Sequence, residues 1–491
     1  MRNKSGYDLN TLVIIGNCSV CAIAMVLYYS KGANQYINIY TLILLCIFGA
    51  QNLLILLYEK KKRDPFVLLL MIIVLVFYMA RVVTLLYDPW SLALDRHSGT
   101  SDDLNCSLVF IMLYNAAIFL GLSAASGKIL YKNKKIFDGY PAKPCNIMII
   151  LLVGIVVAFY ISLASDLMGR FAKYITSIFI NLPLIILFTL LYLVINNKKL
   201  PRRYRAGILL LIGIYMVLYT LAGSRSALLT LGVLLLIGIM VVKDRVSFNR
   251  KALLIGTILI PVSVAFFISA TYIRGVVSRR SVVSSYQLTI LKESNIFSSK
   301  GIKMLCRPIF DRMGFLDYSA VVIRNHEEYG KIINFQYYFK SVIDNALTPG
   351  YDIFGTPRVA HSMSYISRGE SVPTYEDVAG AYQSDMATVY GEYYVLFHGY
   401  PALIILFSIC FIFKKIYLWI RCKDSFSFYL RRALVLYVFY LWVNSFGLDW
   451  MVLDLIRIII TVCIFENWYK MRRKEVKSVY EGNEAVGDTV F

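Results

Sequence analysis

The chain alternates between long apolar blocks and short polar, mostly basic segments. The hydrocarbon core of a bilayer, about 30 Å thick, requires about 20 apolar residues per helix. The pattern therefore predicts an all-α polytopic membrane protein. We expect twelve membrane-spanning helices, at residues 10–29, 37–58, 66–87, 106–125, 146–165, 174–195, 207–222, 227–242, 253–271, 394–413, 433–449 and 451–467.

The basic segments predict the orientation of these helices. Short cytoplasmic loops of membrane proteins are enriched in Lys and Arg. With the N-terminus in the cytoplasm, the segments EKKKR, NKKLPRRYR and YKMRRKEVK all lie on the cytoplasmic side. The short outer loops then carry few basic residues, namely Lys31, Arg96, Arg170, Lys173 and Arg225. We therefore expect both termini to face the cytoplasm.

The spans divide the chain into three regions: nine helices in 1–271, one large outer loop at 272–393, and three helices with a cytoplasmic tail in 394–491. Loops of this length are uncommon and usually functional. This loop is rich in Tyr and Phe, so we expect amphipathic helices at the membrane surface. Its first part, to residue 340, is basic and suits phosphate. The remainder is acidic and aromatic and suits sugars, although a solvated loop with chance charge blocks is the alternative.

Composition agrees with a membrane protein. Hydrophobic residues make up 58% of the chain and charged residues 16%, with a mean hydropathy of +0.63, whereas soluble domains have about 45–50% apolar and about 25% charged residues. The net charge of +21 is explained by the basic cytoplasmic loops, so we expect no nucleic-acid partner. The first apolar stretch lacks a small-residue cleavage site, which predicts a retained helix.

Motifs for metals and nucleotides are lacking. The nine cysteines show neither a disulfide framework nor zinc spacing. The sequence also contains no P-loop and no H-E-x-x-H motif. We expect neither a metal nor a cofactor.

Arg225 stands between two apolar segments of about 16 residues each, which are short for a bilayer. The hairpin tip GSRS should therefore lie at or just below the outer interface. Ser226 is suited to cap the next helix, whose first turn presents free N–H groups. Arg225 beside that helix end predicts a site for a lipid phosphate or diphosphate. The alternative is an arginine that extends to ordinary headgroups.

Further arginines lie in or near the predicted spans. Arg81 has no acid near it in the sequence and is a candidate anion ligand, as is Arg274 just after the ninth span. Arg457 has Asp454 three residues before it, so it either binds ligand or forms a structural ion pair. A guanidinium group suits phosphate because its planar fork binds two oxygens at once.

Candidate acids and bases follow in the acidic part of the loop. Asp385 and Glu392 are seven residues apart, which places both on one face of a helix. His361 and His398 are further candidates, each with a purely structural role as the alternative. Transfer from a diphosphate needs an acceptor hydroxyl that gives up its proton and a leaving group whose charge is neutralised. A carboxylate or imidazole meets the first need and arginines meet the second.

Two stretches resemble motifs of the O-antigen (polysaccharide repeat-unit) polymerases of bacterial inner membranes. GSRSALL, at 223–229, resembles the S-R-x-x-L element that opens a helix in that family. GEYYVLFHGYPALI, at 391–404, resembles the G-E-x-Y…F-G…G stretch that follows the large loop, with His398 where a glycine-containing F-G step is common. The family belongs with the O-antigen ligases to a metal-independent branch of the GT-C-type membrane glycosyltransferases. The order of spans, large loop and final helices is also similar.

The resemblance implies an enzyme at the periplasmic face of the inner membrane. It would move a growing glycan from undecaprenyl diphosphate to the non-reducing end of one lipid-linked repeat unit. Arg225 would bind the donor diphosphate, Arg274, Arg279 and Arg280 would assist, and the Glu392 region would lie near the acceptor. Expected partners are lipid-linked glycans, membrane lipids and a chain-length regulator.

Three other functions fit the pattern of spans. A lipid-linked oligosaccharide flippase would have similar spans but two similar halves and short loops, which this chain lacks. An O-antigen ligase would perform the same chemistry on a lipid A core acceptor. A channel or a receptor with an extracellular sensing loop is the remaining alternative.

Overall fold

The computed structural model describes residues 7–59, 64–125, 202–221, 226–242, 247–248, 313–348, 353–366, 388–420, 425–444 and 451–460, together with single residues and pairs between and after them. Its regular secondary structure is helical except for two short strands. β1 (Tyr7–Asp8) pairs with β2 (Ser247–Phe248) in an antiparallel bridge. The predicted spans at 146–165, 174–195 and 253–271 lie outside the described residues.

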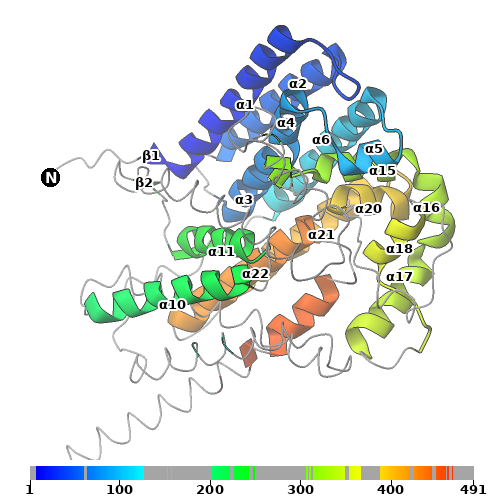
Figure 1. Cartoon of the computed structure of the whole chain (residues 1–491). Coiled ribbons are helices and arrows are strands. Elements are labelled where there is room, and N and C mark those ends of the chain that lie inside the picture. The colour runs from blue at the N-terminus through cyan, green and yellow to red at the C-terminus, as the bar shows by residue number, and fades with distance from the viewer. Residues whose placement is uncertain are drawn as a thin grey trace, which may run out of the picture.

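The N-terminal helices pack side by side (Figure 1). They are α1 (Leu9–Lys31), α2 (Ile39–Glu59), α3 (Pro65–Val74), the π-helix η1 (Leu75–Met79), α4 (Ala80–Tyr87), the short α5 (Leu92–Arg96) and α6 (Ser101–Ala124). Segments α3, η1 and α4 follow one another directly and form one apolar span, Pro65–Tyr87.

Local sequence explains where two of these helices begin. Asp64 accepts a hydrogen bond from the Phe66 N–H, and Pro65 occupies the first turn, where its missing N–H costs nothing. Thr100 and Asp103 form a capping box at the start of α6.

The later helices complete the bundle. They are α10 (Arg202–Leu221), α11 (Ser226–Val242), α21 (Ala402–Trp419) and α22 (Ser425–Val443), followed by a helical segment at 451–460. Helix α11 packs against α22 and α3, and α21 runs along α6. At that crossing a Cβ on Gly121 would lie 2.3 Å from the carbonyl oxygen of Phe407, so only glycine permits this approach.

The predicted outer loop is helical where it is described. It contains α15 (Phe315–Arg324), α16 (His326–Ile332), α17 (Phe335–Val342), the π-helix η2 (Ile343–Leu347), α18 (Val359–Ile366) and α20 (Thr388–Phe397). Helices α15, α16 and α20 pack on one another, and α15 and α20 also contact α6. The described part of the loop therefore folds against the helix bundle.

Five helices in the described part of the chain are long and apolar enough to cross a membrane: Leu9–Lys31, Ile39–Glu59, Pro65–Tyr87, Ser101–Ala124 and Ala402–Trp419. The first four coincide with the first four predicted spans, so these predictions are confirmed as apolar helices. We treat the chain as a membrane protein on this basis.

The predicted tenth span, 394–413, is wrong. The chain breaks between α20 and α21, where His398 and Gly399 take φ values of 51° and 84° and Pro401 precedes the new helix. The left-handed conformation ends α20, and the Tyr114 hydroxyl donates to the Gly399 carbonyl at 2.7 Å. The apolar span consequently begins at Ala402, and residues 394–397 belong to a helix of the loop region.

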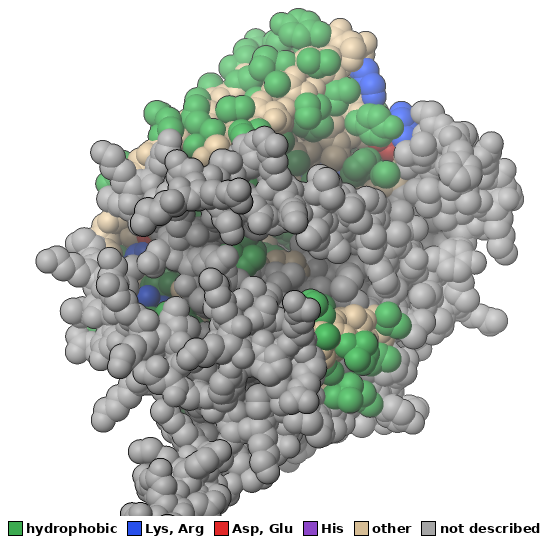
Figure 2. All heavy atoms as spheres, turned by 90° about the vertical axis from the view of Figure 1, so that its left-hand side faces the viewer, with side chains coloured by type: hydrophobic (Ala, Val, Ile, Leu, Met, Phe, Trp, Pro, Cys, Tyr) green, Lys and Arg blue, Asp and Glu red, His purple; other side chains and the backbone are tan. Residues whose placement is uncertain are grey.

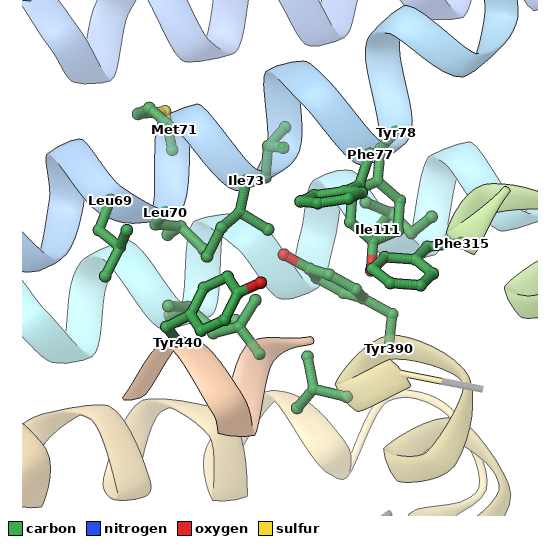
Figure 3. Packing of buried hydrophobic residues seen from close by; sticks show 14 of the residues in the cluster. Leu69, Leu70, Met71, Ile73, Phe77, Tyr78, Ile111, Phe315, Tyr390 and Tyr440 are labelled. Atoms are coloured by element: carbon green, nitrogen blue, oxygen red, sulfur yellow. The ribbon is translucent and has the colours of Figure 1, made fainter. Parts of the chain in front are cut away.

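Aromatic side chains fill the contact between the loop and the bundle (Figure 3). Phe77 of η1 stacks on Phe315 of α15 with ring centroids 4.8 Å apart, and Tyr78 meets Tyr390 of α20 edge-on at 5.0 Å. Side chains on the outside are also apolar, as Figure 2 shows across its upper part. Val26 and Tyr29 of α1 are 68% and 83% exposed, as expected of a lipid-facing helix.

Candidate active site

Arg81 is used inside the protein, which corrects the expectation that it is available to a ligand. It is fully buried, and its Nε and Nη2 atoms donate to Asp317 of α15 at 2.9 and 2.6 Å. Nη1 donates to Thr84 at 3.1 Å and Nη2 to the Trp90 carbonyl at 3.0 Å. Ser91 donates its hydroxyl proton to the same Asp317 carboxylate at 2.6 Å. Arg81 is therefore a buried structural cation that ties α15 to α4.

Other basic residues of the loop's first part also pair with acids of the N-terminal region. Arg307 binds Asp88 through Nε at 2.9 Å. Arg324 binds Asp103 at 3.0 Å and also donates to the Ser98 carbonyl. Both contacts join the large loop to the segment between the third and fourth predicted spans. The predicted arrangement of spans puts these two segments on the same side of the membrane, where they can meet.

Glu392 is the predicted acid–base candidate with the most distinctive environment. It lies on α20 and is 2% exposed, and its carboxylate accepts a hydrogen bond from the hydroxyl of Tyr338 on α17. Burial and the neighbouring carboxylates Glu392 and Asp449 raise the pKa of Tyr338 well above its usual value. The phenol therefore stays protonated and donates at physiological pH. Buried ionisable groups with such neighbours are concentrated at functional sites.

The backbone at both ends of α20 is strained. Thr388 and His398 have φ values of 54° and 51°, in the left-handed region that β-branched residues in particular avoid. The Thr388 side chain is held by the Tyr78 hydroxyl at 3.0 Å and lies 3.3 Å from the Ser319 hydroxyl. Strain of this kind persists where surrounding structure enforces it, and it clusters at functional sites.

Asp449 connects the C-terminal helices to the same loop helices. It is 1% exposed, and its Oδ2 atom accepts from Ser341 Oγ at 2.9 Å and from the Val359 N–H at 3.2 Å. Ser341 follows Tyr338 by three residues on α17, so the bond to Asp449 also fixes the helix that carries the phenol. We call Glu392, Tyr338, Ser341 and Asp449 the Glu392 cluster.

Two arginines act on Asp454, in the helical segment that follows Asp449. The predicted pair of Arg457 with Asp454 is present, at 3.2 Å. Arg358 immediately precedes Val359, and its charge acts on Asp454. The Glu392 cluster thus supplies carboxylates and a phenol, the groups needed to accept a proton. Arg358 is one residue from Val359, whose N–H donates to Asp449.

The two predicted histidines have different positions. His361 lies on α18, whose first N–H is bound by Asp449, and α18 shares a hydrophobic cluster with α17 and α20. His398 is exposed at the turn after α20, where its ring approaches Gly330. The structure therefore places His361 on α18, whose first residue binds Asp449 of the Glu392 cluster, and His398 at the surface.

The remaining predicted site residues lie outside the described residues: Arg225, Arg274, Arg279, Arg280 and Asp385. Helix α11 begins at Ser226, immediately after Arg225. The predicted span began at residue 227, so the two starts differ by one residue. Sequence reasoning missed Tyr338, Arg358 and Asp449 as site residues. The sequence offered two signals: the aromatic run that contains Tyr338, and the position of Asp449 inside an apolar segment.

No family model, no curated protein and no solved structure matches this chain.

Proposed function

We propose that this protein polymerises glycan repeat units carried on a lipid diphosphate. A growing glycan passes from its undecaprenyl diphosphate to the non-reducing end of a new lipid-linked unit, at the periplasmic face of a bacterial inner membrane. The observation that carries the proposal is the buried Glu392 carboxylate held by Tyr338, beside Asp449, where the loop folds onto membrane helices.

The proposed reaction requires one proton acceptor. The acceptor hydroxyl attacks the anomeric carbon, a new C–O bond forms, and the bond between that carbon and the diphosphate oxygen breaks. Glu392 accepts the hydroxyl proton, while the Tyr338 hydrogen bond orients its carboxylate. The electron pair of the broken bond leaves with the lipid diphosphate.

Positive charge for the leaving group comes from arginines in this proposal. Arg225, with Arg274, Arg279 and Arg280, contacts the donor diphosphate, as the resemblance implies. Arg457 is paired with Asp454 at 3.2 Å, the structural role that the sequence left open, and it is not assigned to the diphosphate. Arg81 is excluded from this role because Asp317, Thr84 and the Trp90 carbonyl occupy its donors.

A glycan ladder from a strain lacking the gene tests the proposal. We expect single repeat units on lipid A, and we expect the long ladder to return with the wild-type gene but not with Glu392→Gln. Polymer that accumulates on the carrier lipid without reaching lipid A would instead identify a ligase. Units trapped on the cytoplasmic face would identify a flippase.

A further inference from the structure

Two lysines share one aromatic ring at the end of α1. Lys31, the last residue of α1, has its Nζ 4.5 Å from the ring centroid of Tyr87, the last residue of α4. The Nζ of Lys303 lies 5.3 Å from the same centroid. Lys31 donates to the Tyr87 carbonyl at 2.8 Å, and within the described part of the chain neither lysine forms a salt bridge.

The carboxylate that acts on Lys31 is already engaged. Asp88 acts on Lys31 electrostatically, but its two oxygens accept from Arg307 at 2.9 and 3.3 Å. Lys31 and Lys303 also repel each other. Three cations around one carboxylate leave an excess of positive charge, and a bound anion relieves this repulsion.

The position of the lysines favours an anion carried by a lipid. Helix α1 leads to them with an exposed apolar surface that includes Val26 and Tyr29. Figure 2 shows this apolar surface bordered by Lys or Arg side chains at its upper right. The guanidinium of Arg307 lies 5.2 Å from the Trp90 ring centroid, and Trp and Tyr at helix ends are typical of the membrane interface.

We propose that Lys31, Lys303 and Arg307 form a binding site for the diphosphate group of a lipid carrier, with the lipid chain along α1. This interfacial cation site is separate from the diphosphate site assigned to Arg225. The polymerisation proposed above binds two lipid-diphosphate-linked glycans and releases one lipid diphosphate for each bond formed. In that framework, on which this one step rests, the site holds the diphosphate of the acceptor unit, which stays attached to the product. A diphosphate suits the site better than a phosphodiester headgroup because it carries more negative charge.

Binding of farnesyl diphosphate to the full chain tests the site without requiring turnover. The protein is placed in phosphatidylcholine nanodiscs, and bound ligands are counted by native mass spectrometry during a titration. We expect Lys31→Ala/Lys303→Ala to weaken one binding event by roughly tenfold or more, because two of the three cations that attract the diphosphate are removed. Lys331→Ala is the control, because Lys331 is exposed on α16 and its replacement removes one positive charge outside the proposed site.

Two results would overturn the site. One is unchanged farnesyl diphosphate binding in the double variant and also in Lys31→Glu/Lys303→Glu. The other is displacement of farnesyl diphosphate by phosphatidylglycerol at equal concentration, which would reduce the site to an ordinary headgroup contact. A wild-type protein that binds one farnesyl diphosphate, lost in the lysine variants but kept in Arg225→Ala, supports this site while contradicting the donor site at Arg225.

Discussion

The buried Arg81–Asp317 pair gives the sharpest prediction about stability. Replacing Asp317 with Leu leaves a fully buried guanidinium without its counter-ion, and replacing Arg81 with Met leaves the carboxylate with only the Ser91 hydroxyl among its described side-chain donors. Breaking a buried pair from one side costs about 3–5 kcal/mol. We therefore expect each single variant to lose free energy of unfolding of that order.

Removing both charges together should cost less than the sum of the single losses. The double variant no longer contains an unpaired buried charge, although the Trp90 carbonyl and Ser91 hydroxyl lose partners at roughly 1–3 kcal/mol each. We expect a coupling free energy on the order of 2–3 kcal/mol. The proteins are unfolded with sodium dodecyl sulfate in mixed micelles, and far-ultraviolet circular dichroism monitors the unfolding. This yields the free energies of unfolding of the wild type, the two single variants and the double variant.

Additive losses would refute the buried pair. A ligand-binding role for Arg81 makes a different prediction, in which Arg81→Met keeps wild-type stability and loses only diphosphate binding. Lys414→Ala is a useful comparison because it breaks a less buried pair, that with Asp64 at 2.6 Å. We expect that loss to be smaller, since solvent reaches both groups.

Four further predictions concern the site and the helix packing. Tyr338→Phe should move the acid limb of the polymerisation pH profile to higher pH, because a carboxylate that loses a hydrogen-bond donor holds its proton more tightly; an unmoved limb would contradict the Glu392 role. Asp449→Ala should cost about 1–3 kcal/mol of stability, and Asp449→Asn should cost less than half of that. Ser341 and the Val359 N–H both donate to Oδ2 of Asp449, and the amide oxygen of Asn can accept both hydrogen bonds. Equal losses in the two variants would show that the charge of Asp449 matters more than this geometry. Gly121→Ala should destabilise the detergent-solubilised protein by about 1–3 kcal/mol, because its Cβ meets backbone of α21; wild-type stability would mean that the helices separate freely. Arg225→Ala should abolish long polymer and Arg225→Lys should restore it in part, since a point charge replaces a fork; a full ladder in both would remove Arg225 from the mechanism.

The sequence predicted the first four spans because each is a continuous apolar block bounded by polar residues. The prediction of the tenth span was wrong for a local reason. Residues 394–413 are apolar enough to predict one helix, but His398 and Gly399 adopt positive φ values and Pro401 follows them. Hydrophobicity alone does not indicate such a turn, and the resulting shift moves Glu392 from the edge of a span into a separate loop helix.

Partners across long sequence distances were beyond pattern reasoning. Asp317 is 236 residues from Arg81, so the sequence indicated an arginine without an acid where the fold supplies one. Glu392 was identified from its type and position, whereas Tyr338 becomes visible only when α17 packs beside α20. The pair Arg457–Asp454 was predictable because both residues lie within one helical turn.

Turnover of a purified lipid-linked repeat unit by the purified protein tests the central claim most directly. Wild-type protein should convert the unit into a ladder of longer glycans and release the lipid diphosphate in equal number to the bonds formed. Glu392→Gln should bind the same substrate and lose at least about a hundredfold in rate, the size expected when a general base is removed. No ladder from the wild-type protein, or an equal rate from Glu392→Gln, would contradict the account.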